Sequence, residues 1–555
     1  MEKQFAGLIP PNSKNVLEFI GEDLNVDEHS KIKEKFLLIN PNCNYTISNK
    51  SDVKIKNADV VILSSSSFAT LSKKNLISFI NKSAKHLKDD GLMIFLLENM
   101  SYAENIAALL AGRKPPFNSN LTLEELQDAV NNSDLQIKKS VHTVRDIKVN
   151  PALEEFAKVP LNVTHFIICA VKKSAASKFE NTLIQSYLGE VLVCAAVRVN
   201  DPNRFIATNP SVVLSSKKSG TGLSLSDDPQ YSKKIFINQR VSVDSVEQGI
   251  NFFNSIAGKN YLFIEEIDDN PIVWREKYEE TQFINFIAVH GVQTSTKSLG
   301  EFFKQFNPNV RVFENQLTEL PPQRKFKDEI ARNEPTIIFF GALNRDHDFY
   351  EILPAINKIA AEYGNNILFK VIAKTELFNT IETQNKIALG RREVYNSQYV
   401  PFNVYMKELH TSHISLLPLR NNIFNRSKSD LKFIECAGNG SVVLASPTVY
   451  ENTIKDGETG FIYRDVSDFY QKLKMLIDNQ TKRIEVAQKA YDYVKHNRLL
   501  SQHYQERWDW YNELLKKLPE LNSQTQKRIE ILKEKGISYF GGFGEVNEKI
   551  DVFDN

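Results

Sequence analysis

The sequence predicts an α/β protein that contains several parallel sheets. Short apolar runs rich in β-branched residues alternate with helical stretches through most of the chain, as they do in βαβ units. The 555 residues exceed what one hydrophobic core organises, so roughly three or four domains are expected. Hydrophobic residues at 42% and charged residues at 25% are typical of a globular protein and exclude the disordered and collagen-like classes.

The charge balance and the cysteines exclude several kinds of partner. The chain has 69 Lys and Arg against 68 Asp and Glu, so no global field attracts nucleic acid or an anionic membrane. The scattered Cys43, Cys169, Cys194 and Cys436 predict buried free thiols, which fit a reducing compartment, rather than a disulfide framework or a metal cluster. No leader pattern and no apolar run near the ~20 residues of a membrane span are found. We therefore expect a cytoplasmic protein without a membrane span.

A first domain is predicted at residues 1–175. Its expected strands are 16–20, 36–40, 59–65, 92–99, 135–141 and 165–171. Helical segments separate the first five of these runs. The last two lack a convincing helix between them, which predicts an antiparallel strand in this sheet.

Three segments of this domain, DVVILS (59–64), HLKDDGLMIF (86–95) and LTLEEL (121–126), resemble landmarks of class I S-adenosylmethionine-dependent methyltransferases. In that family the first strand ends in a glycine-rich turn and the second in an acidic residue. Here the first turn contains only Gly21, and the second expected strand ends in Asn40. The resemblance implies a degenerate methyltransferase-like domain that serves docking or assembly, and S-adenosylmethionine is not expected as its cofactor.

Two further sets of strands are expected after residue 185. The second set comprises 191–197, 234–239, 261–268, 283–289 and 310–315, and the third comprises 336–342, 367–373, 413–419 and 441–446. The polar, proline-bearing stretch at about 316–334 predicts a linker between them. The two sets are similar in size, which predicts two domains facing each other across a cleft. Residues 466–518 are expected to be helical, and the tail 519–555 is left without an expectation.

The segment 416–460 reads as a strand, a loop, a helix, a second strand and a glycine-containing turn, with FIECAGNGSVVLAS at 433–446. It resembles glycosyltransferases of the GT-B fold, especially the retaining family 4 and its relatives, over about 185–518. The resemblance implies two Rossmann-like domains, an acceptor domain at 185–325 and a donor domain at 330–498. It also implies a cross-over helix at 499–518 and a nucleoside diphosphate sugar as donor. No metal is expected, because no Asp-x-Asp motif stands at a suitable strand end.

The resemblance implies that Glu435 binds the ribose hydroxyls of the donor, since a carboxylate accepts hydrogen bonds from two neighbouring hydroxyls. Lys428, Lys432 and Glu435 stand at i, i+4 and i+7 and are expected on one helical face, with Lys428 in the first turn beside the diphosphate. The alternative is a solvated charged stripe that contains a Lys432–Glu435 pair.

Other donor-binding candidates follow neighbouring strands. Arg420 ends the strand at 413–419, where a guanidinium suits a phosphate, and its alternative is a surface arginine. Gly341, Asn344 and Arg345 form the first loop of the donor domain, in which Arg345 is a substitute for the family's lysine. Asn425 belongs to the loop 425–428.

One departure from the family concerns its paired glutamates, which lie eight positions apart. Counting back from Glu435 gives Ser427, so the first glutamate is missing. The site therefore recognises a different sugar or handles it through the loop 425–428. Retention of anomeric configuration is expected from the resemblance alone.

The stretches 197–205 and 265–271 are expected on the acceptor side of the cleft. There Asp268 and Asp269 are candidates to orient an acceptor hydroxyl or to act as its base, and their alternative is an ordinary turn and helix cap. His290 is expected to be a packed histidine. Trp508 and Trp510 are expected to pack between domains, with sugar stacking as the alternative.

These observations predict a glycosyltransferase that moves a sugar from a nucleoside diphosphate to a hydroxyl of a glycan or a protein, with retention. Lys428, Arg420 and a helix N-terminus would neutralise the departing diphosphate. The resemblance implies a role in surface-polysaccharide or glycoprotein assembly. One alternative is a degenerate scaffold that binds glycans or partner enzymes. The other is a bifunctional protein with an active methyltransferase. The sequence does not indicate the oligomeric state.

Overall fold

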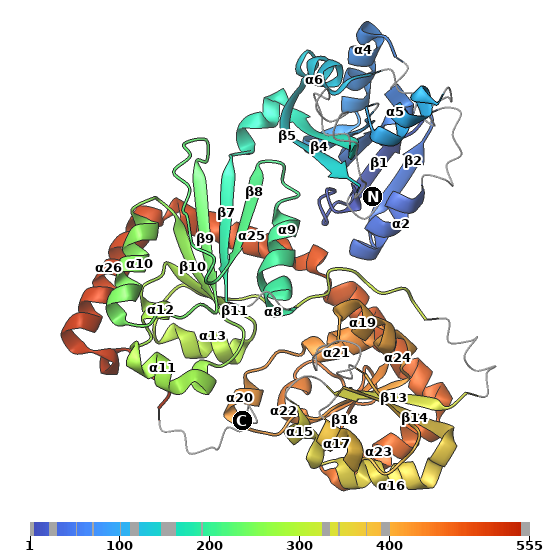
Figure 1. Ribbon diagram of the computed structural model, residues 1–555, viewed down its shortest axis with the longest axis vertical. Helices are drawn as coiled ribbons and strands as arrows, with labels where there is room; N and C mark the ends of the chain where they lie inside the picture. The colour runs from blue at the N-terminus through green and yellow to red at the C-terminus, as the bar shows by residue number, and fades with distance from the viewer. Residues whose placement is uncertain are drawn as a thin grey trace. The chain divides into compact units, whose positions relative to one another are not determined.

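The computed structural model describes residues 5–21, 30–50, 53–68, 71–99, 101–111, 121–145, 162–189, 193–324, 334–341, 345–372, 375–389 and 400–544. The chain divides into two compact units, one of Met1–Leu183, Asn203–Leu214 and Asp228–Lys233 and the other of Ile184–Pro202, Ser215–Asp227 and Lys234–Asn555. The described residues form three six-stranded sheets, the first in the smaller unit and the third in the larger one (Figure 1).

The first sheet has the strand order β2-β1-β3-β4-β6-β5. Its strands are β1 (Asn15–Phe19), β2 (Asn44–Ser48), β3 (Ala58–Ser64), β4 (Leu87–Glu98), β5 (Leu135–Val144) and β6 (Val163–Lys172). Its helices are α2 (Ser30–Ile39), α3 (Ser65–Phe68), α4 (Lys73–Ala84), α5 (Ala103–Leu110), α6 (Leu123–Asn131) and η2 (Lys173–Lys178). Strand β6 runs antiparallel to both β4 and β5, so the predicted antiparallel strand is confirmed.

The second sheet has the order β12-β11-β10-β9-β7-β8. Its strands are β7 (Thr182–Leu188), β8 (Val212–Lys218), β9 (Lys233–Gln239), β10 (Leu262–Glu266), β11 (Gly291–Thr294) and β12 (Val310–Val312). The helices of this region are α8 (Val193–Ala195), the π-helix η3 (Ala196–Asn200), α9 (Asp201–Ile206), α10 (Val246–Ala257), η4 (Pro271–Trp274), α11 (Arg275–Glu280), α12 (Ile284–Ile287) and α13 (Lys297–Lys304). Strands β9 to β12 are parallel.

The third sheet is parallel throughout and has the order β15-β14-β13-β16-β17-β18. Its strands are β13 (Thr336–Gly341), β14 (Ile367–Ile372), β15 (Lys386–Ala388), β16 (Ile414–Leu417), β17 (Val442–Ala445) and β18 (Phe461–Ile462). Its helices are α15 (Asp346–Tyr350), α16 (Leu353–Tyr363), η5 (Gly364–Asn366), α17 (Thr375–Thr380), α19 (Phe402–Thr411), α20 (Ile423–Arg426), α21 (Leu431–Gly438), α22 (Pro447–Tyr450), α23 (Val466–Asp478) and α24 (Gln480–Asn497).

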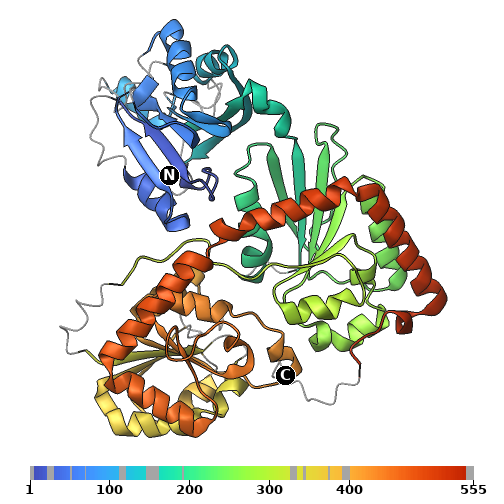
Figure 2. The ribbon, with the colours of Figure 1, turned by 180° about the vertical axis from the view of Figure 1, so that it is seen from behind.

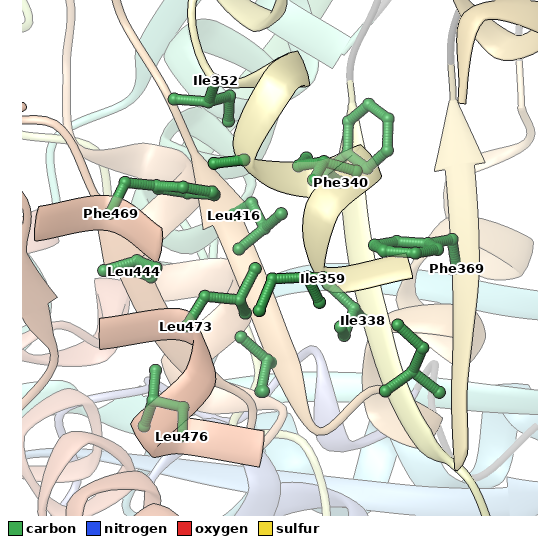
Figure 3. Packing of buried hydrophobic residues seen from close by; sticks show 14 of the residues in the cluster. Ile338, Phe340, Ile352, Ile359, Phe369, Leu416, Leu444, Phe469, Leu473 and Leu476 are labelled. Atoms are coloured by element: carbon green, nitrogen blue, oxygen red, sulfur yellow. The ribbon is translucent and has the colours of Figure 1, made fainter. Parts of the chain in front are cut away.

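The core of the third sheet shows why its helices form where they do. In α23, Phe469, Leu473 and Leu476 recur at i, i+4 and i+7 and are fully buried. Figure 3 shows these side chains in one cluster with Leu416 and Leu444 of the strands. This packing buries one face of the third sheet against α23.

The chain crosses between the second and third sheets twice at the same place. Leu317 donates its backbone N–H to the carbonyl of Arg498, and Leu500 donates to the carbonyl of Leu317, at 2.9 and 2.8 Å. Helix α25 (Leu500–Lys516) then crosses the second sheet, and α26 (Leu518–Lys535), followed by η6 (Ile537–Tyr539), lies beside α10 and α12 (Figure 2). Tyr511 of α25 donates to the side chain of Gln293 in β11 at 2.7 Å. The helical prediction for 466–518 is confirmed, and α26 extends it.

Three expected strands are wrong. Residues 36–40 belong to helix α2 and its end, because Ile32, Phe36 and Ile39 have helical spacing and are all buried. The described part of 191–197 is helical, and the strand of that region is β7. Residues 283–289 contain the one-turn helix α12, and the strand follows it as β11.

The other expected strands each overlap a strand of the structure. The four cysteines form no disulfide; Cys43, Cys169 and Cys436 are buried as predicted, whereas Cys194 is only partly buried. Among the described residues, no helix has the length and apolar character that crossing a membrane requires.

Candidate functional site

A cavity of about 260 Å³ lies at the carboxyl ends of the third sheet, within the larger unit. Parallel sheets place ligands at this edge, because the loops that follow neighbouring strands meet there. The residues that line the cavity and carry charge are Arg240, Asp268, Asp269, Arg345, Asp346, Lys428, Lys432 and Glu435. The ends of β13 and β16 supply its apolar wall.

Gly341 ends β13 and also lines the cavity. Its φ of +109° is a conformation that other residues rarely adopt, and an added Cβ would lie 2.0 Å from the carbonyl oxygen of Ile372. The backbone therefore requires glycine here. Asn344, predicted for the same loop, lies outside the described residues.

Arg345 lies in the cavity wall and contacts two polar side chains. Its Nη1 is 3.0 Å from Oδ1 of Asn425 and 3.1 Å from Oδ2 of Asp348. Asp348 also accepts from Nδ2 of Asn425 at 3.0 Å and from the backbone N–H of Arg420 at 2.9 Å. Arg420 and Asn425 do not line the cavity, and both contact Asp348, which contacts Arg345 in the cavity wall.

Asp348 was missed by the sequence analysis. Its partners lie 3, 72 and 77 residues away, so no local pattern marks it. Its buried carboxylate joins α15 to the loop after β16. It therefore restrains Arg345, which directly precedes α15.

Lys428 lies in the cavity wall, but it does not belong to the helix that was expected to carry it. Helix α21 begins at Leu431, and Lys428 stands in the turn after α20, so the expected shared helical face with Lys432 and Glu435 is wrong. Asn422 caps the N-terminus of α20 by accepting from the backbone N–H of Asn425, and the helix ends after one turn at Arg426. Lys428 Nζ is 2.9 Å from Oδ1 of Asp269. Burial lowers the pKa of Lys428, and Asp269 opposes that shift.

Asp268 and Asp269 follow β10 and share a cation, Arg240. The guanidinium is 2.7 Å from Oδ1 of Asp268 and 2.5 Å from Oδ2 of Asp269. Burial alone would raise the pKa of Asp269, but Lys428 and Arg240 outweigh burial and lower it to about 2. An ionised carboxylate held on both oxygens is a poor proton acceptor, which argues against Asp269 as a base.

Arg240 itself was missed. It follows β9 with a φ of +56°, in the left-handed region that non-glycine residues seldom adopt, and its guanidinium lies over the ring of Trp274 at 5.9 Å. Strain of this kind is held only where the surroundings fix it. The bidentate contact with the two aspartates supplies that restraint.

Ser427 does not line the cavity. Its hydroxyl accepts from Nδ2 of Asn270 at 3.0 Å, and its carbonyl accepts from the hydroxyl of Thr296 at 3.0 Å. The next two residues also bond to the second-sheet region, Lys428 to Asp269 and Ser429 to Asn315 at 2.8 Å. The segment 427–429 is thus held by contacts from three successive residues.

Glu435 of α21 lines the cavity and is only 2% exposed. Its Oε2 accepts from Nζ of Lys432 at 3.0 Å and from the hydroxyl of Tyr405 at 2.8 Å. The Lys432–Glu435 pair weighed as an alternative from the sequence is therefore present, and it lies in the wall of the cavity rather than in a solvated stripe. Tyr405, on α19, was not predicted.

The remaining candidates lie elsewhere. Arg198, within the stretch 197–205, is buried against Glu266 at 2.8 Å, so it serves the fold rather than the cavity. His290 accepts from the backbone N–H of Phe263 at 2.8 Å and is packed, as predicted. Trp510 is buried edge-on against Phe313, so its packing role is confirmed. Among the described residues, no group of three or more His, Cys, Asp and Glu is arranged to hold a metal ion.

Several solved structures resemble parts of this chain at low identity. A mutant of S. aureus TarM in complex with fondaparinux, alpha-GlcNAc-glycerol and UDP is 15% identical, with a TM-score of 0.38 over 52% of this chain and 56% of that chain. A glycosyltransferase from Rickettsia africae is 14% identical with a TM-score of 0.42 over 61% and 99%. WaaG, a glycosyltransferase involved in lipopolysaccharide biosynthesis, is 10% identical with a TM-score of 0.41 over 59% and 98%. The match to TarM thus spans about half of that chain's length.

No curated protein matches the chain, but a family model matches its C-terminal part. Residues 369–513 match a model described as glycosyl transferase-like. This segment includes Tyr405, Lys428, Lys432 and Glu435. The glycosyltransferase prediction therefore agrees with a family model over residues 369–513 of the chain.

Proposed function

We propose that this protein transfers a sugar from a nucleoside diphosphate sugar, bound in the 260 Å³ cavity, to a hydroxyl of a glycan or a protein. The observation that carries the proposal is that Lys428, Arg345 and Glu435 line one cavity. Lys428 and Glu435 lie within the glycosyl transferase-like segment, and Arg345 precedes it. Cationic groups suit a diphosphate, and a carboxylate suits the ribose hydroxyls.

In the reaction, the bond between the sugar C1 and the diphosphate oxygen breaks, and its electrons stay on the diphosphate. The acceptor oxygen forms the new bond to C1, and its proton passes to the departing diphosphate. Lys428 and Arg345 would stabilise the charge that develops on the diphosphate, because fixed cations in a water-poor site act strongly on a transition state. Arg420, outside the cavity wall, would support Arg345 through Asp348.

Asp268 and Asp269 lie on the side of the cavity that the second sheet supplies. With its pKa near 2, Asp269 is suited to orient Lys428 rather than to take a proton. We assign contact with the acceptor hydroxyl to Asp268. Among the described residues, Arg240 is the one cation that forms an ion pair with its carboxylate. Retention of configuration, and a role in surface-polysaccharide or glycoprotein assembly in the cytoplasm, are proposed on the family resemblance.

For the first domain we propose a methyltransferase-like fold without methyl transfer, which serves docking or assembly. The order β2-β1-β3-β4-β6-β5 with one antiparallel strand supports the fold. Gly21 remains the only glycine near the end of β1, which supports the loss of cofactor binding. Calorimetry of the full chain with S-adenosylmethionine should show no micromolar binding, and such binding would overturn this part of the proposal.

The test of the main proposal is transfer and donor hydrolysis by the purified chain across UDP-, GDP- and dTDP-sugars. One donor should be turned over, and Lys428→Ala and Glu435→Ala should each reduce turnover. A second candidate function, a catalytically degenerate scaffold, is favoured by Ser427, which bonds to Asn270 where the family has a glutamate. Binding of a nucleotide sugar without any turnover would favour the scaffold.

A further inference from the structure

Tyr405 forms part of the cavity although nothing in its sequence neighbourhood marks it. The side chain is 6% exposed, and its hydroxyl lies 2.8 Å from Oε2 of Glu435, which is 30 residues away. Phe339 of β13 meets the tyrosine ring edge-on, with centroids 5.9 Å apart. The ring is therefore held on one side by packing, and its hydroxyl has a defined direction.

Lys432 completes a three-residue arrangement with Tyr405 and Glu435. Its Nζ lies 3.0 Å from the tyrosine hydroxyl, 3.0 Å from Oε2 of Glu435 and 4.3 Å from the centroid of the tyrosine ring. An ammonium group can only donate, so the tyrosine oxygen accepts from Lys432. The single hydroxyl proton of Tyr405 is then directed to Glu435.

These contacts leave the two carboxylate oxygens of Glu435 in different situations. Both hydrogen bonds from Tyr405 and Lys432 end on Oε2, and none of these contacts uses Oε1. A buried carboxylate needs donors to remain ionised, and two charge-assisted bonds on one oxygen also fix its torsion. Burial, followed by the neighbouring Glu435, raises the pKa of Tyr405 well above its usual value, so the hydroxyl stays a donor.

We propose that Tyr405 is a positioning residue that holds the Glu435 carboxylate so that Oε1 is presented to the ribose hydroxyls of the donor nucleotide. The inference rests on the proposed function, since it assigns the ribose to Glu435. It adds that the affinity for the ribose depends on a hydroxyl outside the glutamate-bearing helix. Without that hydroxyl, the carboxylate keeps Lys432 but loses the bond that sets its orientation.

The test is Tyr405→Phe, which removes one hydroxyl and preserves the packed ring. Loss of a hydrogen bond to a charged group corresponds to about a ten-fold to hundred-fold change in an equilibrium constant. We expect the KM for the donor to rise by about ten-fold or more, with kcat changed much less. The preference for a ribonucleoside diphosphate over its 2′-deoxy form should fall in the variant, because the oriented carboxylate reads that hydroxyl.

Tyr491→Phe is the matched control. The hydroxyl of Tyr491 donates to the carbonyl of Pro321 at 2.9 Å, so the change also removes one phenol hydrogen bond near the third sheet, but outside the cavity wall. It should leave both the KM and the ribose preference unchanged. Thermal unfolding of both variants without ligand checks that each one folds.

Binding is measured by calorimetry with UDP, GDP and ADP, each paired with its 2′-deoxy form. If the wild-type chain binds none of them and turns over no donor of the sugar-nucleotide panel, the proposed function fails and this inference fails with it. If it turns over a donor but binds none of them, only this inference is overturned. If the wild type binds one of them and Tyr405→Phe keeps the same affinity and the same ribose preference, only the role of Tyr405 is overturned. A loss of ribose preference confined to Tyr405→Phe supports it.

Discussion

Two buried tyrosine–glutamate pairs, one in each unit of the chain, differ in their surroundings. In the first sheet Tyr45 donates to Oε2 of Glu18 at 2.8 Å, and beside the third sheet Tyr405 donates to Oε2 of Glu435 at the same distance. Glu435 also meets Lys432 and lines a cavity. Among the described residues, no ion pair includes Glu18, whose Oε1 is buried without a hydrogen bond.

The difference separates the proposed binding site from a structural pair. Burial raises the pKa of Glu18 to about 7, and the bond from Tyr45 only partly offsets this. In the cavity, by contrast, cations stand beside the carboxylates, as Lys432 does for Glu435 and as Lys428 and Arg240 do for Asp269. Tyrosine and glutamate therefore form a pair without a cation in the first sheet and a pair beside Lys432 at the cavity. The neighbouring cation suits the carboxylate of Glu435 to bind polar groups of a ligand.

The largest effect on transfer is expected from Lys428→Met, which removes one of the cations that line the cavity. Loss of one group that stabilises developing charge lowers the rate by about a hundred-fold or more. The measurement is kcat/KM with the donor found in the sugar-nucleotide panel. Lys474→Met, which removes a cation paired with Glu362 outside the cavity, is the control and should retain full activity. Equal rates in both variants would remove Lys428 from the mechanism.

Asp348→Asn is expected to act next most strongly, through Arg345. The change keeps the shape but removes the charge that holds the guanidinium at 3.1 Å, so the KM for the donor should rise by about ten-fold. Steady-state kinetics measure it. Glu408→Gln, which breaks the Lys370–Glu408 pair in the same region, controls for the loss of an ion pair and should leave the KM unchanged.

Asp269→Asn, unlike the two preceding changes, is expected to strengthen nucleotide binding. Asp269 competes with a diphosphate for Lys428 at 2.9 Å, so its neutralisation should tighten the binding of the free nucleoside diphosphate by about five-fold. Calorimetry measures the dissociation constant. Because the pKa of Asp269 is about 2, its ionisation should contribute no acid limb to the wild-type pH profile near neutrality. Weaker binding in the variant would contradict the competition.

Glu18→Gln should leave transfer unchanged and alter only stability. The folded pKa of about 7 lies above the ordinary 4.5, so the stabilisation is fully present below about pH 4.5 and is lost as the pH rises through 7. The shift corresponds to about 3 kcal/mol in the free energy of unfolding. Denaturant unfolding of the wild type at about pH 5 and pH 8 should show this difference, and the variant should lose it. Glu104→Gln, at an exposed carboxylate, is the control and should keep the pH dependence of the wild type. If Glu18→Gln also keeps it, Glu18 is not the cause of the pH dependence.

The sequence predicted the α/β class and most strands, because buried parallel strands are short apolar runs and these runs are easily recognised in the sequence. It failed where such a run was helical, as at 36–40 and 283–289, since length and composition alone do not separate a short buried helix from a strand. β11, with the sequence GVQT, was missed because two of its four residues are buried polar side chains.

The site could be predicted only in part. Arg345, Lys428 and Glu435 follow strands or a helix in a recognisable frame, and they lie around one cavity, although their roles stay predictions. Arg240 and Tyr405 carry no local signal, because their partners Asp268 and Glu435 lie 28 and 30 residues away. Contacts between distant segments follow from the fold, so residue spacing could not reveal them.

The most direct test of the central claim is a crystal structure of the full chain with the nucleoside diphosphate that calorimetry selects. The account predicts the diphosphate within hydrogen-bond distance of Lys428 and Arg345, and the ribose on Oε1 of Glu435. A nucleotide bound elsewhere, with the Lys428–Asp269 and Tyr405–Glu435 contacts unchanged and the cavity empty, would contradict it.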